Sequence, residues 1–347
     1  MTKANPIFSI IIVTHNGLPL LKRFLPPVAA SVYRELEIII ADNNSDDKSL
    51  EWTKEHFPEV KFLKLDRNYG YAGGNNRAAR IAGGDVLLFL NNDAAPLNSD
   101  WLIPISKLFS DGRADIVQPK LLSAMNPELF DYAGAAGGYI DWLGYPFCRG
   151  RIFDILEKDH GQYDQMPRSL FWASGAAFAI RKELFTELGG FDEIFRFHME
   201  EIDLCWRALK KGKNILYEPK ATVLHLGGGS MDPGSPEKVF HNYRNSLLML
   251  VKNIDQALLP KLFLRLTLDG VSGIRYLLQA KPLFTLAVIR SHFSFYALLR
   301  YALKERALLK RTSRVSCKKL IFPRLIIFQR FLFGKRYFSE ILHLFRK

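Results

Sequence analysis

Hydrophobic and polar residues alternate in blocks over the first quarter of the chain. Short apolar runs, rich in β-branched residues, are separated by longer segments that fit helices. The apolar runs are FSIIIVT (8–14), LEIIIAD (36–42), VKFLKL (60–65) and DVLLFLN (85–91), and helices are expected at 18–31, 46–57 and 74–83. Strands that alternate with helices predict βαβ units and a parallel sheet. Because continuous apolar strands are typical of a sheet covered on both faces, the expected fold class is α/β.

The pattern is less regular beyond residue 96. Residues 97–109 predict a helix that Asn98 or Ser99 caps. Residues 125–170 are rich in Gly, Tyr and Phe and have weak periodicity, so we expect an irregular insertion over the sheet edge. The other elements expected before residue 237 are a strand at 171–181, a helix at 199–212 that ends at Gly212, and short strands at 214–219 and 221–227.

The excess positive charge lies in the last part of the chain, where the pattern is helical from about residue 237. The formal net charge is +13, and residues 245–347 contain 20 Lys and Arg against 4 Asp and Glu. Residues 1–244 contain 28 Lys and Arg against 31 Asp and Glu. A length of 347 residues suggests about two folding units, and we expect the second to begin at residue 253.

A basic helical region indicates an anionic partner. Apolar stretches punctuated by Lys and Arg are typical of helices on an anionic membrane surface, and residues 318–338 combine Phe, Leu and Ile with basic residues. The alternative is a helical subdomain with a basic solvated face. Nucleic acid is disfavoured as a partner, because no helix-turn-helix, zinc or RNP pattern accompanies the charge.

Cysteine content and targeting signals favour a reducing compartment. Cys148, Cys205 and Cys317 are too few and too scattered for a disulfide framework or a zinc site. The N-terminal segment lacks the length and cleavage pattern of a signal peptide. No stretch reaches about 18 uninterrupted apolar residues, so no transmembrane helix is expected.

Three of the predicted strands end in clusters of polar residues. The clusters are Thr14, His15 and Asn16; Asp42, Asn43 and Asn44; and Asn91, Asn92 and Asp93. The carboxyl ends of parallel strands meet at one edge of a sheet, which is where open α/β sheets bind ligands. Asp93 is suited to a hard divalent cation, Mg²⁺ or Mn²⁺, that shares its coordination sphere with diphosphate oxygens.

A glycine-rich loop is a second candidate for phosphate binding. Gly70, Gly73 and Gly74 precede a predicted helix, whose first N–H groups can bind a phosphate. A simple turn into a helix would also explain these glycines. The first strand is not followed by GxGxxG, which disfavours an NAD-dependent enzyme.

Acidic residues gather at the start of the helix expected at 199–212. Glu200, Glu201 and Asp203 can stabilise the helix dipole, and Asp203 can pair with Arg207. Three acids exceed what a cap needs, however, and like charges raise one another's pKa, which suits a general base. His225 lies in an apolar strand. Two interpretations are open: it is a core histidine, or it is a second metal ligand.

Taken in order along the chain, these motifs resemble glycosyltransferase family 2, in its inverting branch with the GT-A fold. The matching segments, over about residues 7–252, are SIIIVTHN, IIIADNNSDD, NYGYAGGNNRA, LLFLNNDAAP, SGAAFAIRKELFTELGGFDEIF, MEEIDLCWRALKKG, VLHLGGGS and HNYRNSLLMLVKN. The likeness is greatest to bacterial rhamnosyltransferase-like members that build cell-surface polysaccharide. It implies a GT-A domain over residues 1–252, followed by the basic helical region over 253–347.

The resemblance also implies a role for each candidate residue. The nucleotide would be held by Thr14, Asn16, Asp42, Asn68, the Gly73–Gly74 turn, Asn91 and Asn92. Asn91 stands where the family has the first Asp of its DxD-type motif, so Asp93 remains as the carboxylate metal ligand and His225 would complete the site. Glu201, the second acid of the family's pair, would be the general base. The acceptor would be faced by Trp172, Gly175 and Glu200.

The implied reaction is an inverting transfer of a sugar from a nucleotide-sugar donor to a saccharide or lipid-linked saccharide acceptor. The favoured donor is dTDP-rhamnose, which would supply L-rhamnose. The enzyme would be cytoplasmic and peripheral on the inner face of the plasma membrane. The alternatives are a family-2 transferase that uses UDP-GlcNAc, UDP-galactofuranose or GDP-mannose, and a non-catalytic protein that binds sugar nucleotides or membranes.

Overall fold

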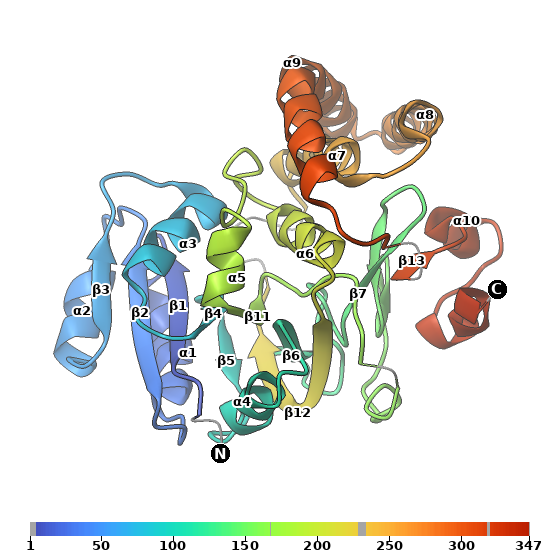
Figure 1. The fold of residues 1–347 in the computed structure, drawn as a ribbon. Helices are drawn as coiled ribbons and strands as arrows, with labels where there is room; N and C mark the ends of the chain where they lie inside the picture. The colour runs from blue at the N-terminus through green and yellow to red at the C-terminus, as the bar shows by residue number, and fades with distance from the viewer. Residues whose placement is uncertain (1–4, 167, 228–233, 318–319, 347) are drawn as a thin grey trace.

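The central layer of the protein is an eight-stranded sheet. The computed structural model describes residues 5–166, 168–227, 234–317 and 320–346. The strand order is β3-β2-β1-β4-β11-β6-β12-β5 (Figure 1). The strands, in that order, are Lys61–Lys64, Leu36–Asp42, Phe8–Thr14, Val86–Leu90, Ala177–Arg181, Ile116–Ser123, Ile215–His225 and Ala94–Pro96. Strands β1 to β4 lie where the apolar runs predict them, and the α/β fold class is confirmed.

Helices cover both faces of this sheet. Neighbouring residues of β1 point to opposite faces, so Ile11 lies in one hydrophobic core and Ile10 in the other. The core around Ile11 is closed by α3 (Gly70–Ile81), α5 (Lys182–Glu187) and α6 (Glu200–Lys210). The core around Ile10 is closed by α1 (Leu18–Ala29) and α4 (Leu102–Ser110), and α2 (Ser49–His56) packs beside α1.

Several predicted boundaries are wrong. Helix α4 begins at Leu102, and its N-cap is Trp101 rather than Asn98 or Ser99. Only the last part of 171–181 pairs in the sheet, as β11. The two strands predicted at 214–219 and 221–227 are one strand, β12, whose register shifts between Glu218 and Thr222. Proline, here residue 219, has no N–H for the ladder, which accounts for the apparent break in the sequence.

Part of the expected irregular insertion, residues 125–170, forms a second sheet. Strands β7 (Gly138–Asp141), β8 (Pro146–Cys148), β9 (Arg151–Ile152) and β10 (Ile155–Leu156) pair in sequence. Strand β13 (Ile321–Phe322) pairs with β7 in parallel, so a segment from the C-terminal region completes this sheet. Strands of two to four residues are too short to produce a periodic signal, which is why the sequence indicates a loop.

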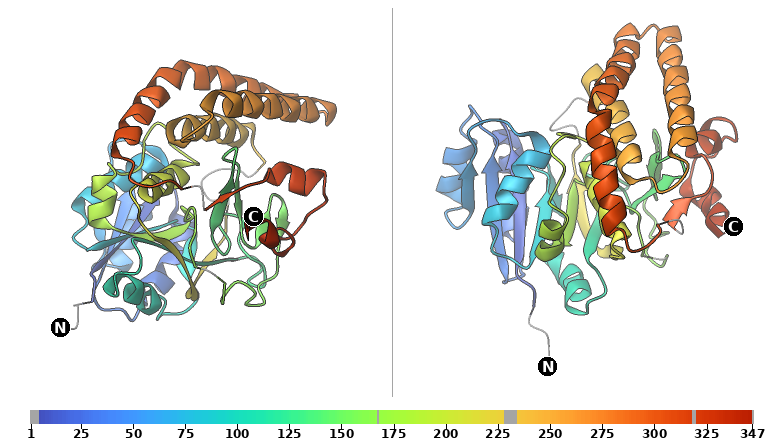
Figure 2. Two further views of the ribbon diagram at one scale, coloured as in Figure 1. Left: turned by 45° about the vertical axis from the view of Figure 1, so that its right-hand side comes forward. Right: turned by 45° about the horizontal axis from the view of Figure 1, so that its top comes forward.

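The C-terminal region is helical, as predicted. Helices α7 (Pro236–Asn253), α8 (Leu258–Leu278) and α9 (Pro282–Thr312) are followed by β13, α10 (Ile326–Phe331) and the short 3₁₀ helices η2 (Phe338–Glu340) and η3 (Leu342–Arg346). Figure 2 shows α8 and α9 side by side, with their connection directed away from the central sheet. Residues 228–230 of the VLHLGGGS motif and the lysines at 318 and 319 lie outside the described residues.

Within the described residues, one helix could cross a membrane by length and composition alone. It is α9, in which 22% of the apolar 18-residue window is buried. Its apolar residues are interrupted by polar ones, such as the run from Arg290 to His292, so the search for an uninterrupted run misses it. Its C-terminal half is fastened to the rest of the protein, because Tyr301 donates to Asp192 (2.7 Å) and Arg306 donates to the carbonyl of Val251 (3.1 Å).

A buried ionic cluster joins α6 to α7. Asp203 is fully buried and accepts hydrogen bonds from Arg207 Nε (2.8 Å) and Asn253 Nδ2 (2.7 Å). Lys252 Nζ lies 3.0 Å from the same carboxylate. These two cations hold the pKa of Asp203 below its ordinary value against the opposing effect of burial. The cluster therefore fixes α6, and with it the two glutamates at its start.

We expect Asp203→Asn to lower the free energy of unfolding by about 3 kcal/mol, because it leaves buried cations without their partner. Urea denaturation followed by circular dichroism measures this change. The control is Glu187→Gln, which removes the exposed ion pair with Lys211 (2.7 Å) and should cost less than about 1 kcal/mol. Equal losses in the two variants would show that the buried cluster does not hold α6.

Candidate functional site

The three polar strand ends meet at one edge of the central sheet. Strand β1 pairs in parallel with β2, which places Thr14 opposite Asp42. On the other side of β1, the amide of Asn92 donates to Thr14 Oγ1 over 3.1 Å. Thr14 and Asp42 are each 2% exposed, so the floor of this edge is polar and nearly closed.

Side chains of this edge also tie its loops together. Asp42 Oδ1 accepts from the backbone N–H (3.0 Å) and the hydroxyl of Ser45. Asn16, which has a left-handed backbone (φ 50°), accepts from the N–H of Asp46 (2.8 Å). The loops that follow β1 and β2 therefore hold each other, with Asn16 exposed at their surface.

Asn43 has a positional role that the sequence did not assign to it individually. Its Oδ1 accepts from the N–H of Tyr69 (3.0 Å), and its Nδ2 donates to the carbonyl of Gly70 (3.0 Å). Asn68 accepts from the N–H of Gly70 (2.8 Å). Together these amides fix the start of α3. The only indication of this role in the sequence is that Asn43 belongs to the second polar cluster, with Asp42 and Asn44.

The start of α3 does not offer free N–H groups to a phosphate, contrary to expectation. The N–H of Tyr71 donates to the carbonyl of Arg196 (3.1 Å), and that of Gly70 is taken by Asn68. A Cβ on Gly74 would lie 2.8 Å from Val13 Cγ1 of β1, so this glycine allows the helix to approach the sheet closely. A Cβ on Gly73 would lie 2.7 Å from Tyr69 Cβ. Packing therefore explains both glycines.

Asp93 and His225 lie together, as predicted for metal ligands. Their Oδ1 and Nε2 atoms are 3.2 Å apart, and both side chains are almost fully buried. His225 Nδ1 lies 3.1 Å from Asp131 Oδ2, a partner that the sequence did not indicate. Burial would lower the pKa of His225, but the carboxylates of Asp131 and Asp93 outweigh it and raise the pKa to about 10.

The pair is an ion pair in this structure, and the same spacing would suit two ligands of a divalent cation once the ring has lost its proton. Two adjacent ligands of an octahedral ion, each about 2.1 Å from it, lie about 3.0 Å apart, close to the distance between the two side chains. Asp131 at Nδ1 orients the ring, as outer partners of metal-binding histidines do. Among the described residues no group of three or more His, Cys, Asp or Glu could hold a metal. The other ligands would therefore have to come from water and phosphate.

Glu200 and Glu201 lie at the first turn of α6. Burial raises the pKa of Glu201 to about 7, and burial with the charge of Glu201 raises the pKa of Glu200 well above its ordinary value. The Oε2 atom of each carboxyl group is buried and has no hydrogen-bond partner among the described residues. Tyr71 donates to the carbonyl of Gly175 (2.8 Å), and a Cβ on Gly175 would lie 3.8 Å from Glu201 Cγ. Gly175 is thus beside the acids, as predicted.

The loop before α6 has an unusual backbone. Arg196, His198 and Met199 all have positive φ angles, of 60°, 65° and 76°. Asn245 of α7 holds this loop, because its Nδ2 donates to the carbonyls of Phe195, Phe197 and His198 over 2.7–2.9 Å. Non-glycine residues keep such conformations only where their surroundings impose them, typically at functional sites. The sequence did not indicate this role of Asn245.

Trp172 is not placed as the resemblance implied. It is 4% exposed, its Nε1 donates to the carbonyl of Tyr139 (2.8 Å), and its ring lies against Gly138 of β7. The ring fixes the second sheet to the segment before β11 and has little surface left for a ligand.

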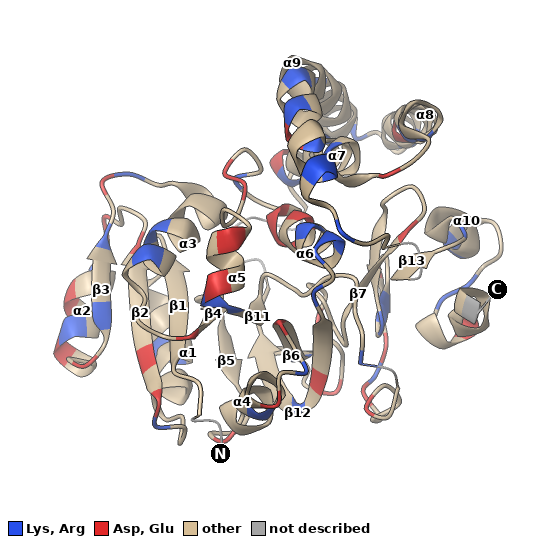
Figure 3. Cartoon of the chain, viewed as in Figure 1, with Lys and Arg blue, Asp and Glu red and all other residues tan. Residues whose placement is uncertain are grey.

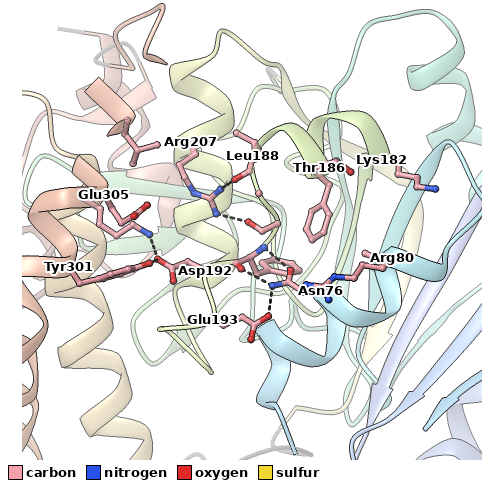
Figure 4. Close-up of a pocket in the computed structure, with 17 residues that line it drawn as sticks. Asn76, Arg80, Lys182, Thr186, Leu188, Asp192, Glu193, Arg207, Tyr301 and Glu305 are labelled. Carbon is pink, nitrogen blue, oxygen red and sulfur yellow. Dashed lines mark hydrogen bonds and ion pairs between the residues drawn. The ribbon is translucent and has the colours of Figure 1, made fainter. Parts of the chain in front are cut away.

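A cavity of about 780 Å³ lies apart from the predicted site residues, none of which lines it. Figure 4 shows its walls, to which α3 contributes Asn76 and Arg80, α6 Arg207, and α9 Tyr301 and Glu305. Two of its cations are already engaged, since Lys252 lies 2.5 Å from Asp192 and Arg207 binds Asp203. The polar edge of the sheet therefore remains the candidate functional site.

Comparisons with known proteins identify the family of the chain and its fold. The family model described as glycosyl transferase family 2 matches residues 9–189. An N-acetylglucosaminyl-diphospho-decaprenol L-rhamnosyltransferase of Mycobacterium tuberculosis is 28% identical over 259 residues, which cover 68% of this chain and 81% of the relative.

Solved structures with the same fold include two proteins in complex with nucleotide sugars. S. aureus TarS, in complex with UDP-GlcNAc, is 17% identical with a TM-score of 0.54, over 91% of this chain and 93% of that one. The mannosyltransferase PcManGT of Pyrobaculum calidifontis, in complex with GDP-Man and Mn²⁺, is 17% identical with a TM-score of 0.52, over 89% and 86%. At this identity the likeness concerns the fold.

The raised pKa of Glu200 predicts that Glu200→Gln raises the melting temperature at pH 8 more than at pH 5. The fold favours the protonated carboxyl, whereas the unfolded chain ionises near pH 4.5. The cost of ionisation is therefore small below that pH and grows as the pH rises toward the folded pKa. Differential scanning calorimetry measures the shift, with the more exposed Glu193→Gln as control. A gain that is equal at both pH values would contradict the raised pKa.

Proposed function

The chain belongs to glycosyl transferase family 2, and from that membership we propose an inverting transfer of L-rhamnose from dTDP-rhamnose to a lipid-linked saccharide acceptor. It is a glycosyltransferase that takes its sugar from a nucleotide sugar. The observation that carries the proposed site is that Asp93 and His225 lie 3.2 Å apart at the strand-end edge.

The choice of donor and acceptor rests on the mycobacterial relative. That protein is named for transfer of L-rhamnose to N-acetylglucosaminyl-diphospho-decaprenol, and its match extends over two thirds of this chain. UDP-GlcNAc, UDP-galactofuranose and GDP-mannose are the alternative donors. Two of these nucleotide sugars are bound in the structural neighbours, but those proteins are only 17% identical. The proposed product belongs to cell-surface polysaccharide.

The strand-end edge would bind the donor. Thr14, Asn16, Asp42 and Asn68 would line the nucleotide site, and Asn91 and Asn92 precede Asp93 in the chain without adding negative charge. Asp93 and His225 would hold a divalent cation, Mg²⁺ or Mn²⁺, with Asp131 orienting the histidine. When bound, this ion neutralises the charge of the departing nucleoside diphosphate. Gly73 and Gly74 are left out of this pocket, because packing explains both.

Glu201 would act as the general base. The Glu201 side chain is only partly buried, so its carboxylate can accept the proton of an acceptor hydroxyl, and a pKa of about 7 lets a substantial fraction be ionised at neutral pH. The acceptor oxygen then forms a bond to the anomeric carbon, and the bond from that carbon to the diphosphate oxygen breaks with its electron pair. Attack from the face opposite the diphosphate inverts the anomeric centre. Glu200, kept protonated, and Gly175 would line the acceptor side.

The proposed place of reaction is the inner face of the plasma membrane, with the enzyme peripheral and its catalytic domain in the cytoplasm. A lipid-linked acceptor requires such a position. The excess of Lys and Arg in residues 245–347 supports contact with anionic lipid.

Glu201→Gln should lower kcat by about 10²–10⁴-fold, the usual contribution of a general base. The KM for the nucleotide sugar should stay within about twofold, since donor binding does not need the base. In the unaltered enzyme kcat should rise with pH through about 7, as Glu201 ionises. Steady-state assays of dTDP release measure both effects.

The matched control is Glu187→Gln, which removes a glutamate that is 49% exposed on α5. Its kcat should equal that of the unaltered enzyme. If Glu201→Gln kept most of its turnover, the base would have to be another group.

Asp93→Ala should abolish the effect of Mn²⁺ on binding of the nucleoside diphosphate. In the unaltered protein, isothermal titration calorimetry with dTDP should show at least about tenfold tighter binding with Mn²⁺ than with a chelator, because Asp93 would hold an ion that offsets the charge of the phosphates. The control Asp111→Ala, at an exposed position after α4, should keep the full effect. Persistence of the metal effect in Asp93→Ala would exclude Asp93 as the ligand.

A further inference from the structure

A typical surface helix buries its apolar side and exposes its polar side. The hairpin formed by α8 and α9 does the reverse. Its exposed side is apolar: Ile274 is 61% exposed, Leu278 84%, Leu283 65% and Phe293 72%. Its buried side contains charge, since Arg265 is only 2% exposed. Soluble proteins rarely expose large contiguous apolar surfaces unless those surfaces bind a partner.

The buried polar groups of α8 show that this orientation is fixed. Arg265 donates to the carbonyl of Leu143 (3.1 Å) and to Ser246 Oγ (2.7 Å). Its guanidinium carbon lies 3.6 Å from the centre of the Tyr145 ring. A helix rotated to bury its leucines would lose these bonds and leave the arginine without them. The apolar side therefore stays outward.

The apolar surface continues onto α10. Arg275 of α8 lies 5.2 Å from the ring centre of Phe331, which brings the two helices together. Phe331 is 47% exposed, and Leu332 and Phe333, which follow it, are 69% and 64% exposed. The hairpin and the end of α10 thus form one apolar surface built from three helices.

Charge on this surface has a single sign. Residues 270–304 contain five Lys and Arg and no Asp or Glu. Figure 3 shows the basic residues spaced along α9. Arg275, Lys281 and Arg290 are exposed beside the apolar residues. Basic side chains next to aromatic and aliphatic ones match an interface where anionic headgroups border hydrocarbon. A second copy of this surface would instead bring like charges together.

We propose that the α8–α9 hairpin inserts its apolar side into one leaflet of an anionic bilayer, with Arg275, Lys281 and Arg290 at the headgroups. Attachment is then driven mainly by burial of apolar surface, not by charge alone. The hairpin does not span the bilayer, because Tyr301 and Arg306 fasten the second half of α9 to Asp192 and the end of α7. This inference deepens the proposed membrane location and rests on it.

Co-sedimentation of the full chain with phosphatidylcholine–phosphatidylglycerol vesicles tests the insertion. The protein should bind, and most of it should stay bound at about 0.5 M NaCl, where attraction between surface charges is screened. The double variant L278E/L283E should lower the bound fraction at least about tenfold. The control M125E/V32E changes two residues of similar exposure, 74% and 56%, outside the hairpin, and should bind as the unaltered protein does.

Three results would overturn the inference. The first is release by salt together with full binding of L278E/L283E, which would mean attachment by charge alone. The second is absence of vesicle binding with a dimer, in analytical ultracentrifugation, that L278E/L283E converts to monomer. The third is absence of both binding and self-association. Vesicle binding needs no turnover, so a chain that binds vesicles but transfers no sugar would refute the proposed function alone.

Discussion

Parallel pairing of β1 with β2 on one side and β4 on the other determines where the proposed donor site lies. The pairing sets Thr14 opposite Asp42 and brings Asn92 within hydrogen-bond distance of Thr14. Every other feature of the donor site depends on this register, since a shift of one residue would send each of these side chains to the opposite face. The apolar strands keep the register because their alternate residues fill two separate cores.

The acid pair depends on a second constraint, the position of α6. Burying Glu200 costs stability, and the loop before the acid pair has three non-glycine residues with positive φ. Both costs are offset by contacts with α7. Asn245 holds the loop, and the Asp203 cluster holds the helix. The same α7 packs against α9, so the acid pair of the proposed active site and the proposed membrane hairpin share one support.

Long-range contacts explain most of what the sequence could not predict. The βαβ pattern and the polar strand ends follow from local periodicity, and the structure places both as expected. Strand β13 pairs with β7 across almost two hundred residues, and no local pattern indicates such a pairing. Likewise, the role of Asp131 depends on its position beside His225, and the carbonyl of Arg196 binds the N–H of Tyr71. The resemblance predicted that Trp172 faces the acceptor, whereas in the structure its ring packs against Gly138.

The central claim is that Asp93 and His225 form the cation site for the donor diphosphate. Its most direct test is an anomalous difference map, recorded at the manganese absorption edge, from crystals soaked with Mn²⁺ and dTDP. The account predicts one strong peak within ligand distance of both Asp93 Oδ1 and His225 Nε2, in contact with phosphate oxygens. A peak elsewhere, or ordered diphosphate with no peak between these side chains, would contradict it.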